Sequence, residues 1–132
     1  MLQWKDGQPW SARFDDRYFS AESGIDETRH VFLQGNRLAE RFASLGAGQV
    51  FRIGETGFGT GLNFLCAWRL FEQMAPIGAA LEFRSVEAFP LDTASLRAAL
   101  ALWPEQVSWA ELLCTAWPDA TPGSHRLSFG RV

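Results

Sequence analysis

The chain has 132 residues, of which 47% are hydrophobic and 20% are charged. This mixture is typical of one folded domain and excludes a disordered segment. The formal net charge of −3 provides no overall attraction for nucleic acid. The sequence contains no run of about 18 apolar residues, the length that a membrane helix needs. The N-terminus lacks the pattern of a signal peptide. We therefore expect a cytoplasmic protein that does not bind membranes.

The cysteines and histidines are too dispersed to form a recognisable metal motif. Cys66 and Cys114 lie far from each other and from His30 and His125. This spacing matches neither a zinc site nor a CxxC redox pair. We predict no metal site and two buried, reduced thiols.

The first part of the chain is predicted to form a short β-hairpin over residues 2–14. Asp6-Gly7 is a favourable tight-turn pair between two short segments that each contain a tryptophan. Residues 14–24 are aromatic and acidic, and we expect an ordered loop there.

A helix is predicted to begin at residues 26–28 and to continue to Phe42. Its apolar residues recur at helical spacing, although Gly35-Asn36 interrupts the pattern. The glycines of residues 46–48 end this segment. We treat residues 1–48 as an N-terminal hairpin, loop and helix extension of the domain.

Residues 49–132 have the pattern of a βαβ unit. A short strand over residues 50–53 leads into a glycine-rich loop at 54–61, a helix over 62–74 and a second strand over 81–86. This order predicts a parallel, doubly wound α/β sheet.

Two further helices are predicted over residues 91–102 and 107–117, and a strand over 125–129 that enters a turn at Gly130. Two parallel strands do not make a finished sheet, so we expect an incomplete domain, truncated at Val132. An open sheet edge is also expected to promote self-association.

Three alternating glycines mark a ligand-binding loop between the first strand and its helix. Gly57, Gly59 and Gly61 allow a sharp turn and a close approach of a ligand to the backbone. The N-terminus of the following helix directs unpaired N–H groups at that ligand. The dinucleotide fingerprint G-x-G-x-x-G differs in spacing, which disfavours a nicotinamide oxidoreductase. The absence of a following Lys-Ser/Thr excludes a P-loop.

Two acidic residues flank this loop. Glu87 follows the second strand, where a carboxylate can accept hydrogen bonds from the ribose hydroxyls of adenosine. It can also be an ordinary surface charge. Glu55 precedes the glycines, either to contact the amino group of a methionine moiety or to cap the helix. The spacing of Glu55 and the glycines is that of the first motif of class I methyltransferases, which bind S-adenosylmethionine.

Other candidates have equally plausible structural roles. Tyr18 either covers the cofactor or packs in the core, Asn36 either contacts it or ends a helix, and Asn63 either contacts it or stabilises the first helical turn. The predicted cofactor-binding residues are Glu55, Gly57, Phe58, Gly59, Gly61, Asn63 and Glu87, with Tyr18 and Asn36 as further candidates.

The sequence resembles the tRNA 5-methylaminomethyl-2-thiouridine methyltransferases, which form the N-terminal part of bifunctional bacterial proteins. The resemblance covers nearly the whole chain. It lies in the loop Glu55-Thr56-Gly57-Phe58-Gly59-Thr60-Gly61-Leu62-Asn63-Phe64-Leu65, and in residues 14–20, 27–33, 35–36, 87–91, 103–104 and 123–127.

The resemblance implies a class I, Rossmann-like fold and S-adenosylmethionine-dependent methylation of the 5-aminomethyl group on the wobble uridine of tRNA, near the anticodon. It also implies a second, FAD-dependent domain that removes a carboxymethyl group, and this domain is absent here. The Asp-Gly-Phe-Ala-Pro motif of the family is absent too. We therefore expect the catalytic residues beyond Val132 and an inactive chain. The alternative is a non-catalytic remnant that at most binds S-adenosylmethionine.

Overall fold

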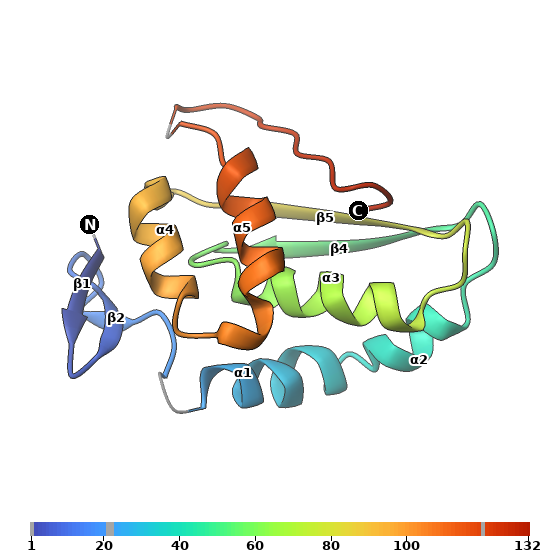
Figure 1. The fold of residues 1–132 in the computed structure, drawn as a ribbon, viewed down its shortest axis with the longest axis horizontal. Helices are drawn as coiled ribbons and strands as arrows, with labels where there is room; N and C mark the ends of the chain where they lie inside the picture. The colour runs from blue at the N-terminus through green and yellow to red at the C-terminus, as the bar shows by residue number, and fades with distance from the viewer. Residues whose placement is uncertain (1, 21–22, 120) are drawn as a thin grey trace.

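The computed structural model describes residues 2–20, 23–119 and 121–132 (Figure 1). The described residues form an antiparallel hairpin sheet, a parallel two-stranded sheet and helices packed on the latter. In chain order the elements are β1 (Leu2–Lys5), β2 (Gln8–Ser11), β3 (Asp16–Arg17), α1 (Gly24–Glu27), the π-helix η1 (Thr28–Gln34), α2 (Leu38–Ala43), β4 (Val50–Thr56), α3 (Leu62–Met74), β5 (Ala80–Val86), α4 (Thr93–Leu100), the 3-10 helix η2 (Pro104–Gln106) and α5 (Val107–Ala116).

The predicted N-terminal hairpin is confirmed. β1 and β2 pair antiparallel, and the turn residues Asp6 and Gly7 both have positive φ, at 51° and 72°. Two consecutive positive φ values are typical of the type I′ turn, whose twist suits a two-residue hairpin. The following segment was expected to be a loop, but its short strand β3 pairs with β2.

The first long helical segment begins at Gly24, slightly earlier than predicted, and much of it is a π-helix. The N–H of Gly35 donates to the carbonyl of His30 at 3.1 Å, which is the i→i+5 pattern of that helix. A side chain at Gly35 would collide with the Val31 carbonyl oxygen. Arg37 then has a φ of 53° and separates η1 from α2. The predicted interruption at Gly35-Asn36 is therefore confirmed.

β4 and β5 pair in parallel, from Val50 opposite Ala80 to Thr56 opposite Val86. The expectation of parallel strands is confirmed, but the predicted end of the first strand, at residue 53, is wrong. β4 continues past residue 53, so Glu55 belongs to the strand and the glycine loop begins only at Gly57. α3 has the predicted bounds.

One face of the parallel sheet is buried and the other is exposed. Ile53 of β4 and Leu81 of β5 are buried in a core with residues of α2 and α3. On the opposite face, Glu82 forms ion pairs with Arg52 and Arg84, each at 2.8 Å. The expectation of a doubly wound sheet is therefore not met within the described residues, because their helices pack on only one face.

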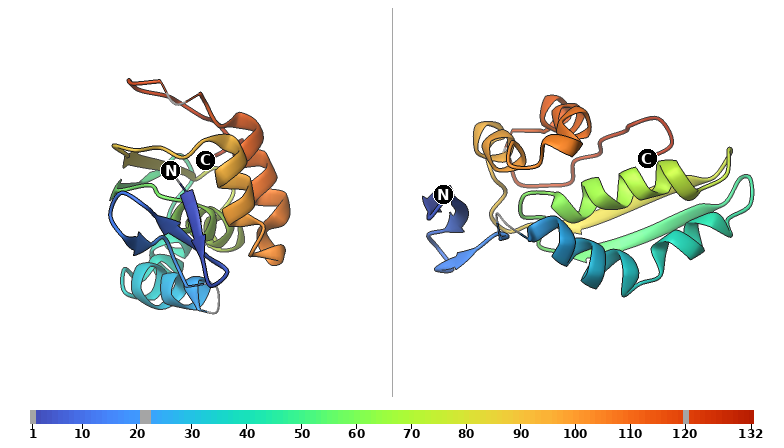
Figure 2. Two further views of the ribbon diagram at one scale, coloured as in Figure 1. Left: turned by 90° about the vertical axis from the view of Figure 1, so that its left-hand side faces the viewer. Right: turned by 60° about the horizontal axis from the view of Figure 1, so that its bottom comes forward.

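α4 and α5 complete the larger core, in which they pack side by side near the hairpin end of the molecule (Figure 2). The predicted start of α4 is confirmed, because the Asp92 carboxylate accepts the Ser95 N–H at 2.8 Å as an N-cap. α4 ends at Leu100, two residues earlier than predicted. α5 matches its predicted range to within one residue.

The strand predicted over residues 125–129 is wrong. The segment has no ladder partner. Its end contacts β5 through one bond, from the Leu81 N–H to the Arg131 carbonyl at 2.9 Å. The Phe129 N–H instead donates to the Val132 carbonyl at 2.7 Å, which closes the predicted turn at Gly130. Association through the open edge of β5 stays a prediction.

Cys66 and Cys114 are buried and unbridged, as predicted, and burial raises the pKa of both thiols. Within the described ranges there is no cluster of three or more His, Cys, Asp or Glu side chains suited to a metal ion. No helix in the same ranges is long and apolar enough to cross a membrane.

Candidate functional site

The carboxyl ends of β4 and β5 bring the glycine loop next to Glu87. The Gly57 N–H donates to the Val86 carbonyl at 2.8 Å, which extends the parallel pairing by one residue. The loop therefore leaves β4 directly beside the residue that follows β5. This is the edge of an open α/β sheet where ligands bind, outside the carboxyl ends of the strands.

The three glycines of the loop all have positive φ but serve different purposes. Gly57, with a φ of 81°, has no atom within 4 Å of the position of an added Cβ, so its backbone borders open space. At Gly61 an added Cβ would lie 2.8 Å from the Phe58 ring and 3.2 Å from Leu113. Gly57 thus leaves room for a ligand, whereas Gly61 permits tight packing where α3 begins.

Phe58 points into the core. Its ring stacks on Trp117 at 5.1 Å and contacts Phe64 at 6.1 Å. It is not among the residues that line the cavity described below. The glycines on either side turn this aromatic residue inward, and its contact with the cofactor stays a prediction that this orientation does not favour.

Glu87 accepts a hydrogen bond through each of its two carboxylate oxygens, one from the glycine loop and one from the segment after β5. One oxygen accepts the Gly59 N–H at 3.0 Å and the other accepts the Phe89 N–H at 2.9 Å. Each carboxylate oxygen has a second lone pair for a further donor. Glu87 is therefore positioned to brace the loop and to accept hydrogen bonds from a ligand.

Glu55 lies behind the loop, between β5 and α3. Its carboxylate accepts hydrogen bonds from the Ser85 hydroxyl at 2.9 Å and the Asn63 amide at 3.2 Å. Burial raises the pKa of Glu55, the charge of Glu87 adds to this rise, and the two hydrogen bonds oppose it. Asn63 thus contacts Glu55 through its side chain, and Glu55 is not the side-chain cap of α3.

The raised pKa of Glu55 predicts a pH-dependent contribution to stability. Because the folded chain holds this proton more tightly than the unfolded chain, the contribution is complete below the ordinary pKa of 4.5. It is lost as the pH rises from 4.5 through the folded-state pKa. We expect Glu55→Gln to remove this loss, so that the variant gains stability relative to the parent over that window. Urea unfolding of both chains across pH 4 to 8 measures the difference, and equal slopes would contradict it.

A cavity of about 820 Å³ opens at these strand ends, within the size range of sites for small molecules and cofactors. It is bordered by the loop after β2, by the glycine loop and by the segment after β5. Its lining residues are Ser11, Arg13, Phe14, Arg17, Tyr18, Gly57, Gly59, Val86, Glu87, Ala88 and Phe89.

The structure brings several of the predicted residues to this cavity. Gly57, Gly59 and Glu87 line it, and Tyr18 lines it from the N-terminal segment. The Tyr18 ring lies 3.5 Å from the position of an added Cβ at Gly59, so tyrosine and loop form one wall. The N-terminal extension is therefore part of the site.

Asn36 lies outside the cavity lining. Its side-chain amide donates to the Phe32 carbonyl at 2.8 Å, which satisfies a carbonyl near the end of η1. The structure thus shows the helix-ending role that the sequence also allowed for this residue, and no contact with the cavity.

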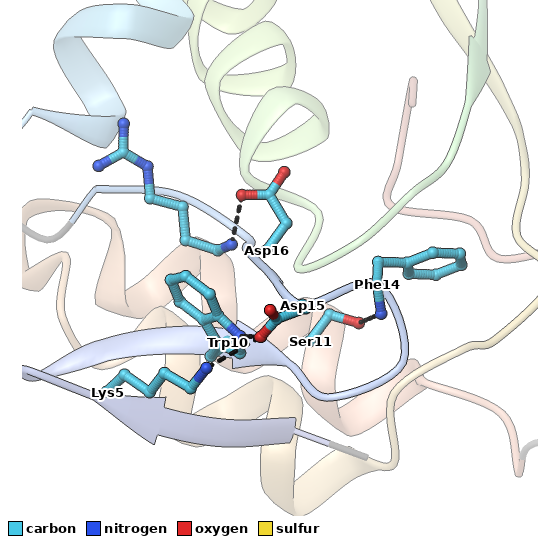
Figure 3. Close-up of polar contacts among 7 residues, drawn as sticks. Lys5, Trp10, Ser11, Phe14, Asp15 and Asp16 are labelled. Atoms are coloured by element: carbon cyan, nitrogen blue, oxygen red, sulfur yellow. Dashed lines mark hydrogen bonds and ion pairs between the residues drawn. The ribbon is translucent and has the colours of Figure 1, made fainter.

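Sequence reasoning missed the cationic and aromatic part of the cavity wall. The Arg13 guanidinium lies 3.8 Å from the centroid of the Phe89 ring, and the Phe14 ring lies 5.7 Å from it. Figure 3 shows Phe14 projecting away from the cluster in which Asp15 accepts hydrogen bonds from Lys5 and Trp10. The signals available in the sequence were the motifs at residues 14–20 and 87–91, which contain Phe14, Arg17 and Phe89 but do not indicate that they meet.

No family model matches the chain. Individual curated proteins do match it, under the name "tRNA 5-methylaminomethyl-2-thiouridine biosynthesis bifunctional protein MnmC". The chain is 63% identical to that of Pseudomonas aeruginosa strain UCBPP-PA14, with 99% of this chain and 20% of the relative covered. It is 58% identical to that of Nitrosospira multiformis, with 100% and 22% covered. It is 53% identical to that of Methylobacillus flagellatus, with 99% and 20% covered.

The chain spans about one fifth of the length of these curated relatives. Identity of this level along nearly the whole chain establishes common descent over that fifth. It confirms the resemblance drawn from the glycine loop and the other motifs. Nearly the whole of this chain is thus homologous to about one fifth of the proteins named tRNA 5-methylaminomethyl-2-thiouridine biosynthesis bifunctional protein MnmC.

Proposed function

We propose that this chain binds S-adenosylmethionine at the carboxyl ends of β4 and β5 and provides the methyl-donor site of a tRNA-modifying enzyme. The reaction would methylate the 5-aminomethyl group of the wobble uridine in cytoplasmic tRNA. The observation that carries the proposal is the hydrogen bond of 3.0 Å from the Gly59 N–H to the Glu87 carboxylate, beside an open cavity. The relatives' name, which concerns tRNA 5-methylaminomethyl-2-thiouridine, supports the choice of substrate.

The residues around the cavity fit the parts of this cofactor. The backbone of Gly57 is open to a ligand, because a Cβ added at this position would meet no neighbouring group within 4 Å. Glu87 has lone pairs free for the two ribose hydroxyls. Glu55 lies at the adjoining strand end but does not line the cavity, and its carboxylate would interact with the ammonium group of the methionine portion directly or through water. The cationic sulfonium and ammonium also suit a site with two carboxylates.

The bound cofactor would supply an electrophilic methyl group on sulfur. The contribution of this chain to the reaction would be mainly to position that group and to exclude water from it. Glu87 and the glycine loop would fix the sugar, and Tyr18 would cover the loop from the N-terminal side. The acceptor amine must be neutral to attack, and its proton acceptor is not assigned to any residue of this chain.

Calorimetric titration of the purified chain with S-adenosylmethionine and, separately, with NADH tests this proposal. We expect saturable binding of S-adenosylmethionine and none of NADH, because the loop lacks the spacing of the dinucleotide fingerprint. Binding of NADH alone would overturn the methyl-donor site. Binding of neither ligand would favour the alternative of a remnant without cofactor.

A methyl-transfer assay separates binding from catalysis. The chain is incubated with radiolabelled S-adenosylmethionine and tRNA that carries 5-aminomethyl-2-thiouridine. Because the Asp-Gly-Phe-Ala-Pro motif is absent from the sequence, we expect binding without transfer. Transfer by the chain alone would show that the residues described here include the acceptor site.

A further inference from the structure

Two arginines at the cavity rim have no carboxylate partner among the described residues. Most other basic side chains in the chain are paired, each with a carboxylate within 4.0 Å: Lys5, Arg29, Arg37, Arg52, Arg84, Arg97 and Arg131. Arg13 and Arg17 line the cavity, and neither forms an ion pair within the described ranges. In a chain with a net charge of −3, unpaired cations here create a local site for an anion.

Arg13 is held in a geometry that leaves its hydrogen-bond donors available. Its guanidinium lies over the Phe89 ring at 3.8 Å. Stacking uses the flat face of the guanidinium, whereas the N–H groups lie along its edge, where they match a phosphate in a bidentate manner. The contact with Phe89 also restricts the arginine side chain before any ligand arrives.

An exposed aromatic ring lies beside this cation. Phe14 is 64% exposed, and its ring contacts that of Phe89 at a centroid distance of 5.7 Å. Single exposed apolar side chains are common on protein surfaces, and what distinguishes Phe14 is its place at the cavity rim, beside the ring over which Arg13 lies. An unstacked nucleobase can stack on such a ring while the adjoining phosphate binds a nearby arginine.

The acids near this surface are only partly neutralised, because Asp15 has a cationic partner whereas Asp16 and Glu87, which lines the same cavity, have none within the described residues. The Asp15 carboxylate is paired with Lys5 at 3.0 Å and with Trp10 at 3.1 Å, and its lowered pKa is caused first by the hydrogen bond from Lys5. Asp16 accepts the backbone N–H of Arg17 at 2.8 Å. Figure 3 shows the Asp15 cluster and Phe14 on different sides of the loop.

We propose that Arg13, Arg17 and Phe14 form a docking rim for single-stranded RNA, with Phe89 supporting Arg13. An unstacked base would lie on Phe14 and its phosphate on Arg13, so that a neighbouring nucleotide reaches the cavity. This inference rests on the proposed function, since it names the surface through which the RNA substrate approaches the methyl donor. It extends that function by assigning residues outside the glycine loop and its acids.

Fluorescence anisotropy with a labelled RNA stem-loop, with its loop single-stranded, tests the rim. We expect Phe14→Ala to weaken binding about tenfold, because the base can no longer stack on the ring. The double variant Arg13→Gln/Arg17→Gln is expected to reduce the slope of log affinity against log salt by about 0.7 for each phosphate that is no longer neutralised. A fully paired RNA duplex of the same length should bind more weakly than the stem-loop and be insensitive to Phe14→Ala.

Arg126 provides the matched charge control. It is exposed, has no ion pair in the described part of the chain and does not line the cavity. Arg126→Gln therefore removes one positive charge elsewhere, against the two that the double variant removes, and we expect it to leave the slope unchanged. An equal effect of Arg126→Gln, or no binding of the stem-loop by the parent chain, would overturn the proposal.

Calorimetry with S-adenosylmethionine on the same variants separates this inference from the proposed function. Weakened RNA binding, measured in the absence of S-adenosylmethionine, supports the rim independently of any change in cofactor affinity, because the replaced residues also line the cofactor cavity. RNA binding that depends on Arg13 and Phe14 in a chain that does not bind the cofactor would support the rim and contradict the methyl-donor site. If the chain binds the cofactor but its affinity for RNA does not change in these variants, only the proposal of the docking rim is contradicted.

Discussion

Replacing Gly57 by alanine is expected to weaken the binding of S-adenosylmethionine by about tenfold or more. Apart from Gly57 itself and its two chain neighbours, no residue described by the structure has an atom within 4 Å of the new methyl group, so this group would occupy space that the proposal gives to the cofactor. A φ of 81° also costs an L-residue about 1–2 kcal/mol. Calorimetric titration gives the affinity, and urea unfolding gives the free energy of unfolding.

Gly48 is the control for this substitution. It has the same φ of 81° and an equally open Cβ position, but it precedes β4 at the opposite end of the strand. Gly48→Ala should therefore lower stability by a similar amount and leave cofactor affinity unchanged. If both variants lose affinity equally, the effect of Gly57 comes from general destabilisation, and the cofactor does not approach this glycine.

The elements that dominate the site were predictable because their signals are local. The apolar residues of α3 recur at helical spacing, and the alternating glycines directly precede them, so the strand, loop and helix order followed from the sequence. The boundary of β4 was misplaced because Gly54 is a breaker signal. Inside the parallel pair it is opposite Arg84, and its missing side chain does not end the ladder.

The wall of the cavity was not predictable, because it depends on contacts between segments far apart in the chain. Nothing local indicates that Arg13 would lie over Phe89, or that Tyr18 would approach Gly59. The inward turn of Phe58 likewise depends on Trp117 of the segment after α5. Hydrophobic periodicity identifies elements, but the relative placement of their ends is decided by packing.

The predicted strand at residues 125–129 failed for a related reason. The sequence can indicate an extended segment, but a strand also needs a partner with free N–H and carbonyl groups. In this structure the backbone bond to β5 is made beyond the segment, by the Arg131 carbonyl, and the Phe129 N–H closes a turn with Val132. The exposed face of β4 and β5, with its Arg52–Glu82–Arg84 ion pairs, likewise could not be inferred from the order of elements.

Replacing Glu87 by alanine should have the largest effect on cofactor binding, because two functions of one carboxylate are removed together. The Gly59 and Phe89 N–H groups lose their acceptor, which loosens the glycine loop. The ribose hydroxyls also lose an ionised acceptor. With about 1.5 kcal/mol for each charged hydrogen bond to the ribose, affinity for S-adenosylmethionine should fall about 100-fold. Glu87→Gln keeps one oxygen acceptor and should lose less.

A variant at Asp92 is the control for Glu87→Ala, because it removes a carboxylate that accepts local hydrogen bonds but has no proposed role in cofactor binding. Like Glu87, it accepts two hydrogen bonds, here from the N–H and the hydroxyl of Ser95, but it does not line the cavity. Asp92→Ala should therefore cost about 1 kcal/mol of stability and leave calorimetric affinity unchanged. Wild-type affinity in Glu87→Ala would show that the sugar is held elsewhere. A comparable loss in Asp92→Ala would attribute both effects to destabilisation of the β5–α4 segment, since that segment carries both acids.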